Sequence, residues 1–473
     1  MNQSTSLRIL YVFCDYLSTL AALLLFVVVR FHLEPVAHMM GSVGAMMSTT
    51  MVRLELLLFP LLMLFVYWLT GYYNEVIMKS RLQELLETLH SALVGMAVFF
   101  LIAMINDVDA DRFNTYKLIA ILAAILFSCT YLMRVALTTA VRKRVADGRI
   151  CRHTLIVGTG PKADSMYARL KKVSRVMGFQ VEGFVSTGKS ADNCLRNCNV
   201  PVYTIDSLKN MIASGSIQTL VVISDDAGIN PTLEIINKLL PLECDVLVDA
   251  EFYQKLSAPV RTQNIIGEPL VDVSHPMISG STANIKRFFD VAISAVALLL
   301  IWPFMLVLAL LVRMDSPGPA IYRQERIGRH KKPFTIYKFR SMYINAESAG
   351  PSLSSPADTR ITPLGRRLRK YRLDELPQLW NVLRGDMSLV GPRPEREYFI
   401  RQIVEKAPSY TLVQQVRPGL TSWGMVKFGY ASTVDQMVQR LRYELMYIDN
   451  ISILLDFRII IYTIKIVLTG KGI

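Results

Sequence analysis

Apolar residues dominate four stretches in the first third of the chain, and charged or polar positions separate them. The stretches are roughly Ile9–Val29, Leu56–Leu69 (extendable to Tyr73), Leu89–Ile105 and Leu118–Val141. Each can cover a hydrocarbon core about 30 Å thick, with the second and third near the short limit. The pattern predicts a four-helix transmembrane bundle over residues 1–150. Because no small-residue cleavage site follows the first stretch, we expect a retained anchor and not a signal peptide.

Charged residues between the stretches predict the orientation of the bundle. Lys79 and Arg81 lie between stretches two and three, and Arg142, Lys143 and Arg144 follow stretch four. Acidic residues, Asp107, Asp109 and Asp111, lie between stretches three and four. The positive-inside rule then places both ends of the bundle in the cytoplasm. Asp15 lies within the first stretch, where we expect a structural hydrogen bond inside the bundle.

Strand-like apolar runs alternate with helix-like segments from His153 onward. The first run leads into Gly158-x-Gly160 and a helix-like segment, and further runs follow at Gln180–Val185, Thr219–Ile223 and Cys244–Val248. This alternation predicts a parallel, Rossmann-like α/β domain over residues 151–280. A Gly-x-Gly turn can cradle a pyrophosphate, but the third glycine of the dinucleotide fingerprint is missing, so the sequence leaves nucleotide binding open.

A further apolar segment, about Ala292–Val312, contains Pro303 near its middle. Basic residues flank both ends, so the charge rule does not favour a crossing. A proline removes one helix hydrogen bond and kinks the chain, which allows a helix to enter and leave the membrane by the same face. We expect a re-entrant helix at about residues 286–312, with a kinked fifth transmembrane span as the alternative. Near the C-terminus, Ile451–Leu468 is apolar but interrupted by charges, which suits a helix lying on the membrane surface.

Composition limits the classes of partner. With 52% hydrophobic residues and a mean hydropathy of +0.34, the chain is too apolar for an ordinary soluble protein. A formal net charge of +14 predicts anionic partners, and the membrane signal makes nucleic acid the least favoured of these. The one close cysteine pair, Cys194 and Cys198, has no matching His or Cys set nearby, so neither a zinc site nor a disulfide framework is indicated.

The densest chemical signal is the Asp374-Glu375 pair, which follows a basic stretch and precedes Gly391-Pro392-Arg393-Pro394. An Asp can attack phosphorus as a nucleophile, a neighbouring Glu can hold a metal or move a proton, and Arg neutralises phosphoryl oxygens. Pro377 fits the first turn of a helix, which would place the two carboxylates at a helix start, where anions are favoured. The plain alternative is that both acids cap a helix and pair with nearby arginines.

Several motifs in a fixed order and spacing carry a family resemblance. They are Tyr337-Lys338-Phe339-Arg340-Ser341-Met342, Asp374-Glu375, Asn381-Val382-Leu383, Gly385-Asp386-Met387-Ser388 and Gly391-Pro392-Arg393-Pro394. From about Lys286 to the C-terminus the chain resembles the bacterial sugar transferases, or polyprenyl-phosphate hexose-1-phosphate transferases, and its upstream layout is similar to their large subgroup with a membrane bundle. The resemblance implies a mainly α catalytic domain over residues 281–473 with a re-entrant helix. That family usually has Ser before the helix-breaking Pro, whereas this chain has Trp302-Pro303.

The resemblance also implies site residues. Asp374 would be the nucleophile, and with Glu375 it would hold Mg²⁺. The implied substrate-binding residues are Lys338, Arg340, Arg369, Arg393 and, more weakly, Arg417.

The implied reaction moves a hexose 1-phosphate from a UDP-hexose to undecaprenyl phosphate and releases UMP, through a covalent phosphosugar on Asp374. Such an enzyme would act at the cytoplasmic face of the bacterial inner membrane, among its lipids, in exopolysaccharide, capsule or O-antigen synthesis, and a homodimer is compatible with the subgroup. In this reading the Rossmann-like domain is a regulatory or scaffolding module. The alternatives are a non-catalytic membrane scaffold or nucleotide sensor, and a metal-dependent hydrolase of lipid diphosphates.

Overall fold

The computed structural model of the chain describes residues 3–33, 41–74, 76, 79, 81–106, 112–186, 200–223, 229–240, 242, 244–249, 270–272, 278–347, 350, 358–429 and 431–469. The acidic loop residues Asp107, Asp109 and Asp111 and the pair Cys194 and Cys198 lie outside these ranges, so the predictions made on them stay untested.

The first of two compact units contains the apolar N-terminal helices and comprises Met1–Cys151, Arg175–Gly178 and Ser279–Ile285. Its helices are α1 (Gln3–Leu33), α3 (Val43–Ser48), α4 (Thr50–Leu69), α5 (Arg81–Asn106) and α6 (Arg112–Ala146). Helix α1 packs against α6 and α4, and α5 packs against the same two helices. All four predicted apolar stretches are therefore helical, and they pack together as a bundle.

Within the described part of the chain, four helices are long and apolar enough to cross a membrane: α1, α4, α6 and α11 (Gly280–Asp315). Helix α5 covers the predicted stretch Leu89–Ile105, but the structure does not describe the side chains of its residues 101–106. The core of the bundle is apolar and aromatic, with Tyr11, Met63 and Tyr67 almost wholly buried.

Asp15 has a buried partner that its sequence position alone did not reveal. The Nε and Nη2 atoms of Arg134 on α6 each lie 2.8 Å from a different carboxylate oxygen of Asp15, and both side chains are 0% exposed. The hydroxyl of Tyr73 also donates to Asp15 over 2.8 Å, and the Arg134 guanidinium lies over the ring of Tyr72. The expected structural role of Asp15 is thus confirmed as a hydrogen-bonded ion pair between α1 and α6.

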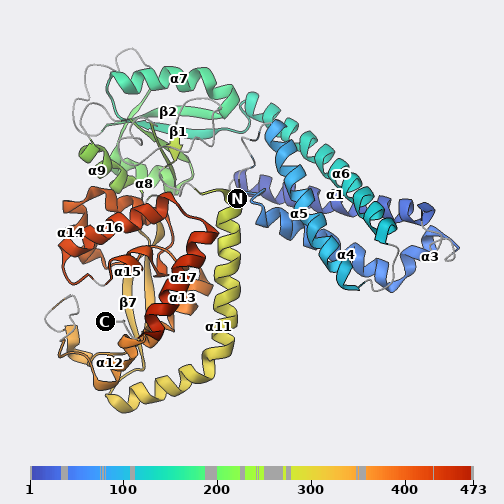
Figure 1. Cartoon of the computed structure of the whole chain (residues 1–473). Helices are drawn as coiled ribbons and strands as arrows, with labels where there is room; N and C mark the ends of the chain where they lie inside the picture. Colours follow the sequence, from blue (N-terminus) through green and yellow to red (C-terminus); the bar gives the residue numbers. More distant parts are fainter. Residues whose placement is uncertain are drawn as a thin grey trace. The chain divides into compact units, whose positions relative to one another are not determined.

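The second unit begins with an α/β layer. Its strands are β1 (Arg152–Val157), β2 (Phe179–Ser186), β3 (Val202–Thr204), β4 (Thr219–Val222), β5 (Asp245–Asp249) and β6 (Leu270–Asp272), and its helices are α7 (Pro161–Met177), α8 (Ile205–Ala213) and α9 (Ile229–Leu239). The described strands form one sheet in the order β3-β2-β1-β4-β5-β6, parallel except for β6. Helix α7 covers one face, and α8 and α9 cover the other (Figure 1). The order and the two covered faces match the predicted Rossmann-like layer.

Helix α11 carries the apolar segment that was expected to be re-entrant. Pro303 lies inside the helix, and only 11% of its most apolar window is buried by protein. Figure 1 shows that the helix is bent, as expected where a proline removes a backbone hydrogen bond. Exposed apolar residues such as Leu299, Leu300 and Trp302 leave a surface that water solvates poorly. The re-entrant path itself stays a prediction.

The remainder of the second unit follows α11. Its elements are β7 (Ile321–Ile327), η2 (Arg329–Lys331), β8 (Pro333–Phe339), η3 (Ile344–Glu347), α12 (Pro363–Lys370), η4 (Leu373–Glu375), α13 (Gln378–Arg384), β9 (Ser388–Val390), α14 (Glu397–Lys406), η5 (Pro408–Gln415), β10 (Gly419–Thr421), α15 (Trp423–Lys427), α16 (Val434–Asp449) and α17 (Ile453–Leu468). Strands β7 and β8 pair as an antiparallel hairpin, and β9 pairs with β10 in parallel. Helices α14, α16 and α17 share one apolar core, which includes Ile403, Leu441 and Ile459. The region is mainly helical, as expected.

Candidate active site

The β7–β8 hairpin supplies one wall of the site. Its register places Tyr322 opposite Lys338 and Ile321 opposite Phe339. Because strand side chains alternate between faces, Tyr322, Gln324 and Arg326 lie on the same face as Lys338. The alternation along β7 therefore places these polar side chains on one face of the hairpin. In the sequence alone, this stretch is recognisable only as basic.

The acidic pair lies in a short 3₁₀ turn and not in the first turn of an α-helix. This turn, η4, is preceded by Arg372 in the left-handed conformation (φ 53°, ψ 24°), and Pro377 is the N-cap residue of α13. A left-handed L-residue costs roughly 1–2 kcal/mol, and here it reverses the chain sharply between α12 and Asp374. Pro377 was expected in the first turn of a helix and instead lies immediately before α13, which corrects that expectation, while the two carboxylates lie just ahead of the helix start, where they were expected.

Glu375 is surrounded by positive charge. Among the described residues, three cationic side chains lie within ion-pair distance of it: Lys338 Nζ at 2.9 Å, Arg372 Nη1 at 3.4 Å and Arg393 Nη2 at 3.6 Å. Burial alone would raise the pKa of Glu375, but the charges of Lys338, Arg393 and Arg372 outweigh it and hold that pKa well below its ordinary value. Glu375 is therefore ionised and held in place.

Asp374 differs from its neighbour. Its residue is only 7% exposed, yet its carboxylate has no hydrogen-bond partner among the described residues. Burial raises the pKa of Asp374, and the adjacent charge of Glu375 raises it further, against Lys338, Arg369 and Arg372. The pair thus combines one acid that is fixed by cations with one that is left available, an asymmetry typical of acids with separate roles.

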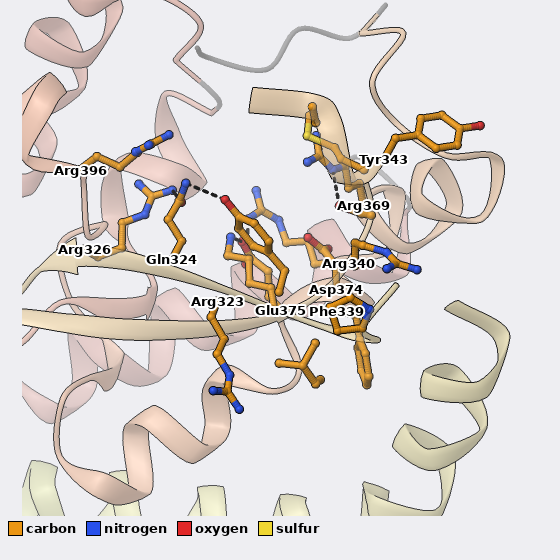
Figure 2. A pocket seen from close by; sticks show the side chains of 18 of the residues that line it. Arg323, Gln324, Arg326, Phe339, Arg340, Tyr343, Arg369, Asp374, Glu375 and Arg396 are labelled. Atoms are coloured by element: carbon orange, nitrogen blue, oxygen red, sulfur yellow. Dashed lines mark hydrogen bonds and ion pairs between the residues drawn. The ribbon is translucent and has the colours of Figure 1, made fainter. Parts of the chain in front are cut away.

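Both acids open into a cavity of about 900 Å³. Figure 2 shows Asp374 and Arg369 toward one side of it and Arg326 and Arg396 toward the other. The charged and polar lining residues are Arg313, Arg323, Gln324, Arg326, Lys338, Arg340, Ser341, Arg369, Arg372, Asp374, Glu375, Arg393, Glu395, Arg396 and Arg440. A space of this size suits a ligand of cofactor dimensions, and its charge favours a polyanion.

The predicted residues Arg369 and Arg340 line the cavity but differ in their contacts. Arg369 Nε donates to Ser341 Oγ over 2.9 Å, which orients the guanidinium near Asp374. Arg340 Nη2 instead donates to the backbone oxygens of Ser316, over 2.5 Å, and Val312, over 3.3 Å. Arg340 therefore ties the last turn of α11 to the wall of the cavity.

Arg417, the weakest of the predicted substrate residues, does not line the cavity. Its Nε donates to the oxygen of Gly385, the C-cap residue of α13, over 2.9 Å. Arg287 of α11 donates to Val382 and Leu383 oxygens at the same helix end, over 2.7 and 2.8 Å. Two arginines thus satisfy carbonyl groups that the last turn of a helix leaves without partners.

Several cavity residues were not identified from the sequence. Arg372 lies within the basic stretch before Asp374, where its proximity to the acid was a usable signal. Arg326 could have been found from the alternation along β7. Glu395 and Arg440 have no local signal, because they meet only through folding: Arg440 Nη2 lies 2.7 Å from Glu395 Oε1.

Comparison with known proteins finds relatives that match this part of the chain. A profile of the family described as Bacterial sugar transferase matches residues 281–470. A UDP-N-acetylgalactosamine-undecaprenyl-phosphate N-acetylgalactosaminephosphotransferase from Aeromonas hydrophila is 40% identical over 45% of this chain and 51% of its own length. A UDP-glucose:undecaprenyl-phosphate glucose-1-phosphate transferase from Klebsiella pneumoniae is 32% identical over 66% of this chain and 67% of its own.

Coverage differs among the relatives. The chain spans about half the length of the Aeromonas protein. It spans 98% of the Exopolysaccharide production protein PSS from Rhizobium leguminosarum bv. phaseoli, which is 40% identical over 40% of this chain. A solved structure, that of RSP in complex with beta-NADH, covers 33% of this chain at 15% identity and a TM-score of 0.19, a likeness that carries no argument. The sequence matches, together with the acid pair in its cationic cavity, establish that the chain belongs to the bacterial sugar transferase family.

Proposed function

We propose that this chain transfers a hexose 1-phosphate from a UDP-hexose to undecaprenyl phosphate, giving undecaprenyl-diphospho-hexose and UMP. One observation carries the proposal: Asp374 is buried without a hydrogen-bond partner among the described residues, while cations hold Glu375 beside it. The Aeromonas and Klebsiella relatives support this reaction class, because both are named as transferases of a sugar phosphate to undecaprenyl phosphate.

The first step is attack by Asp374 on the phosphorus that bears the hexose. A bond forms between an oxygen of Asp374 and that phosphorus, the bond to the bridging oxygen breaks, and its electron pair leaves with UMP. Lys338, Arg369 and Arg372 lie close enough to influence the charge of Asp374, so they also stabilise negative charge on the phosphoryl oxygens. Arg binds two oxygens at once, which suits a diphosphate better than Lys does.

The second step regenerates the carboxylate. An oxygen of undecaprenyl phosphate attacks the same phosphorus, and Asp374 leaves with the electron pair of its bond to phosphorus. Neither step requires net proton transfer, so Glu375 needs no acid or base role. We propose a different role for it, supported by its ion pairs, which is to hold Lys338, Arg372 and Arg393 around the reacting group.

The donor set fits one magnesium ion shared with the substrate. No cluster of three or more His, Cys, Asp or Glu side chains that could hold a metal occurs within the described residues, and the oxygens of Glu375 already contact cations. Asp374 is the available carboxylate, and Mg²⁺ in phosphoryl-transfer sites typically uses one or two carboxylates plus substrate phosphates. When bound, the ion would neutralise charge on the diphosphate.

We place the reaction at the cytoplasmic face of the bacterial inner membrane, with α11 re-entrant. Support comes from the bend of α11 and its unburied apolar surface, and from the lipid acceptor in the names of the relatives. A lipid-linked product of this kind suits the first membrane step of exopolysaccharide, capsule or O-antigen synthesis. The relatives name both glucose and N-acetylgalactosamine, so the proposal extends to UDP-hexoses as a class.

The test is UMP release by the purified full-length protein with Mg²⁺, undecaprenyl phosphate and a panel of UDP-sugars. We expect multiple-turnover release to require the lipid phosphate, with at most one equivalent of UMP per enzyme in its absence, and none above background from Asp374→Asn. Asp435→Asn is the matched control, because that carboxylate is 72% exposed on α16 and lies outside the cavity. Continued UMP release without the acceptor, beyond one equivalent per enzyme, would instead indicate a hydrolase, and full turnover by Asp374→Asn would exclude the covalent route.

A further inference from the structure

A row of alternating charges lies behind the loop that carries Arg393. Arg326 Nη1 lies 3.4 Å from Glu395 Oε2, Arg440 Nη2 lies 2.7 Å from Glu395 Oε1, and Arg440 Nε lies 4.0 Å from Glu444 Oε1. Arg326 Nη1 also donates to the oxygen of Pro394, over 3.2 Å. The row therefore contacts the Pro392-Arg393-Pro394 turn through the side chain of Arg326 and the carbonyl of Pro394.

Glu444, at the end of this row, is 4% exposed and does not line the cavity. The hydroxyl of Ser422 donates to its Oε1 over 2.7 Å, whereas its Oε2 is buried without a hydrogen-bond partner among the described residues. A Cβ at Gly424 would come within 2.5 Å of Oε1, so a larger residue there would have to displace the Glu444 carboxylate. A buried, half-satisfied carboxylate is costly to maintain, and that cost calls for a functional explanation.

The contacts of Glu444 lead to Arg393 through Ser422 and Met425. The hydroxyl of Ser422 donates to Glu444 Oε1. Ser422, bonded to Glu444, also caps α15 by accepting from Met425 N over 3.0 Å. Met425 Sδ in turn lies 3.2 Å from Arg393 Nη1, while Arg393 Nη2 lies 3.6 Å from Glu375. Glu444 on α16 is thus connected to the guanidinium of Arg393 through Ser422 and Met425.

We propose that Glu444 is a positioning residue: it fixes the Pro392-Arg393-Pro394 turn so that the Arg393 guanidinium stays beside Glu375 and faces the phosphates of the nucleotide-sugar donor. The inference rests on the proposed function and deepens it. Glu444 touches no substrate and acts only through Arg393. Loss of Glu444 should therefore weaken donor binding while leaving the attack by Asp374 almost unchanged.

The charge of Glu444 changes within the neutral pH range. Burial raises its pKa to about 7, against the opposing influence of Arg440, Ser422 and the Arg393 backbone, and Glu395 raises it further. Among the described residues, Tyr410 and Tyr447 also interact electrostatically with Glu444. Because Arg440 and the Ser422 hydroxyl favour the ionised carboxylate, protonation of Glu444 below about pH 7 weakens its hold on Ser422, and the donor KM should rise as the pH falls.

The test is a double-mutant cycle on the full-length protein, with the KM for UDP-hexose and kcat read from UMP release. Glu444→Ala should raise that KM roughly tenfold, the effect of losing about one hydrogen bond, with kcat within about twofold of wild type. In an Arg393→Ala background the same substitution should change KM less than about twofold, because the residue through which Glu444 acts is gone. Asp435→Asn, on the same helix, serves as the control.

The pH dependence of KM provides a second readout, which tests the proposal even if the alanine variant does not fold. Glu444→Gln keeps the accepting oxygen but cannot ionise, so it should remove the rise in KM on going from about pH 8 to pH 6 that wild type shows. Equal KM effects of Glu444→Ala with and without Arg393, or an unchanged pH profile in Glu444→Gln, would overturn the positioning role. A wild-type protein that releases no UMP would overturn the proposed function itself, which separates the two failures.

Discussion

Glu375→Gln is the substitution that most directly tests the division of roles in the acid pair. It removes one negative charge that lies 2.9, 3.4 and 3.6 Å from Lys338, Arg372 and Arg393, while keeping the shape of the side chain. All four side chains are less than a fifth exposed, so solvent screens these pairs weakly. Removing one partner of such a buried pair typically costs about 3–5 kcal/mol, because the remaining charges lose their compensation.

Two consequences follow for catalysis. The cations are no longer held around the reacting phosphorus, and we expect kcat/KM to fall by about 10²–10³, as when one donor to a developing charge is lost. The pKa of Asp374 should also fall, because the neighbouring charge of Glu375 raises it in the wild type. In the proposed reaction Asp374 must be ionised to attack, so the acidic limb of the pH profile should move to lower pH.

The assay is kcat for UMP release at saturating donor over about pH 5 to 9, which leaves out the effect of Glu444 on the donor KM, together with kcat/KM at one pH for the size of the loss. Wild type, Glu375→Gln and the exposed control Asp435→Asn are compared under the same lipid and Mg²⁺ conditions. An acidic limb that stays in place or moves to higher pH would refute the coupling between the two acids. An undiminished rate in Glu375→Gln would refute the role of Glu375 in holding the cations.

Two further predictions concern residues outside the cavity. Arg134→Leu should lower the free energy of unfolding by about 3–5 kcal/mol, because Asp15 is left buried without its partner. The thermal midpoint of detergent-purified protein should fall, and adding Asp15→Leu should recover part of the loss. A midpoint equal to that of wild type would contradict the buried pair. Arg417→Ala should cost about 1 kcal/mol of stability, because the Gly385 carbonyl loses its hydrogen bond. The donor KM should stay within about twofold of wild type. A KM increase as large as that of Arg393→Ala would show that Arg417 contacts the donor.

Periodic features of the sequence predicted the elements well. The four apolar N-terminal stretches are helices, and the four predicted strands coincide with β1, β2, β4 and β5. These elements follow from local patterns, since a strand or a membrane helix must repeat its apolar residues along its own length. Strands β3 and β6 are three residues long in the structure, too short to show a period.

Contacts between distant residues could not be predicted in the same way. Asp15 and Arg134 are 119 positions apart, and Glu395 and Arg440 are 45 apart, so neither pair leaves a local pattern. The motif residues Lys338, Arg369, Asp374, Glu375 and Arg393 do line one cavity. What sequence could not supply was the asymmetry between the two acids, because it depends on which carboxylate the folded chain surrounds with cations.

Helix α11 is fastened to the catalytic region near both ends: Lys286 and Arg287 bond to Val390, Asp456 and α13 at one end, and Arg340 bonds to Ser316 at the other. A helix anchored twice cannot slide or tilt independently of the domain that holds it. In the re-entrant arrangement that we propose, the immersion of α11 in the bilayer sets the height of the Asp374 carboxylate relative to the lipid headgroups. A thicker or thinner bilayer would then move both together, so the proposed activity should depend on the acyl-chain length of the lipids.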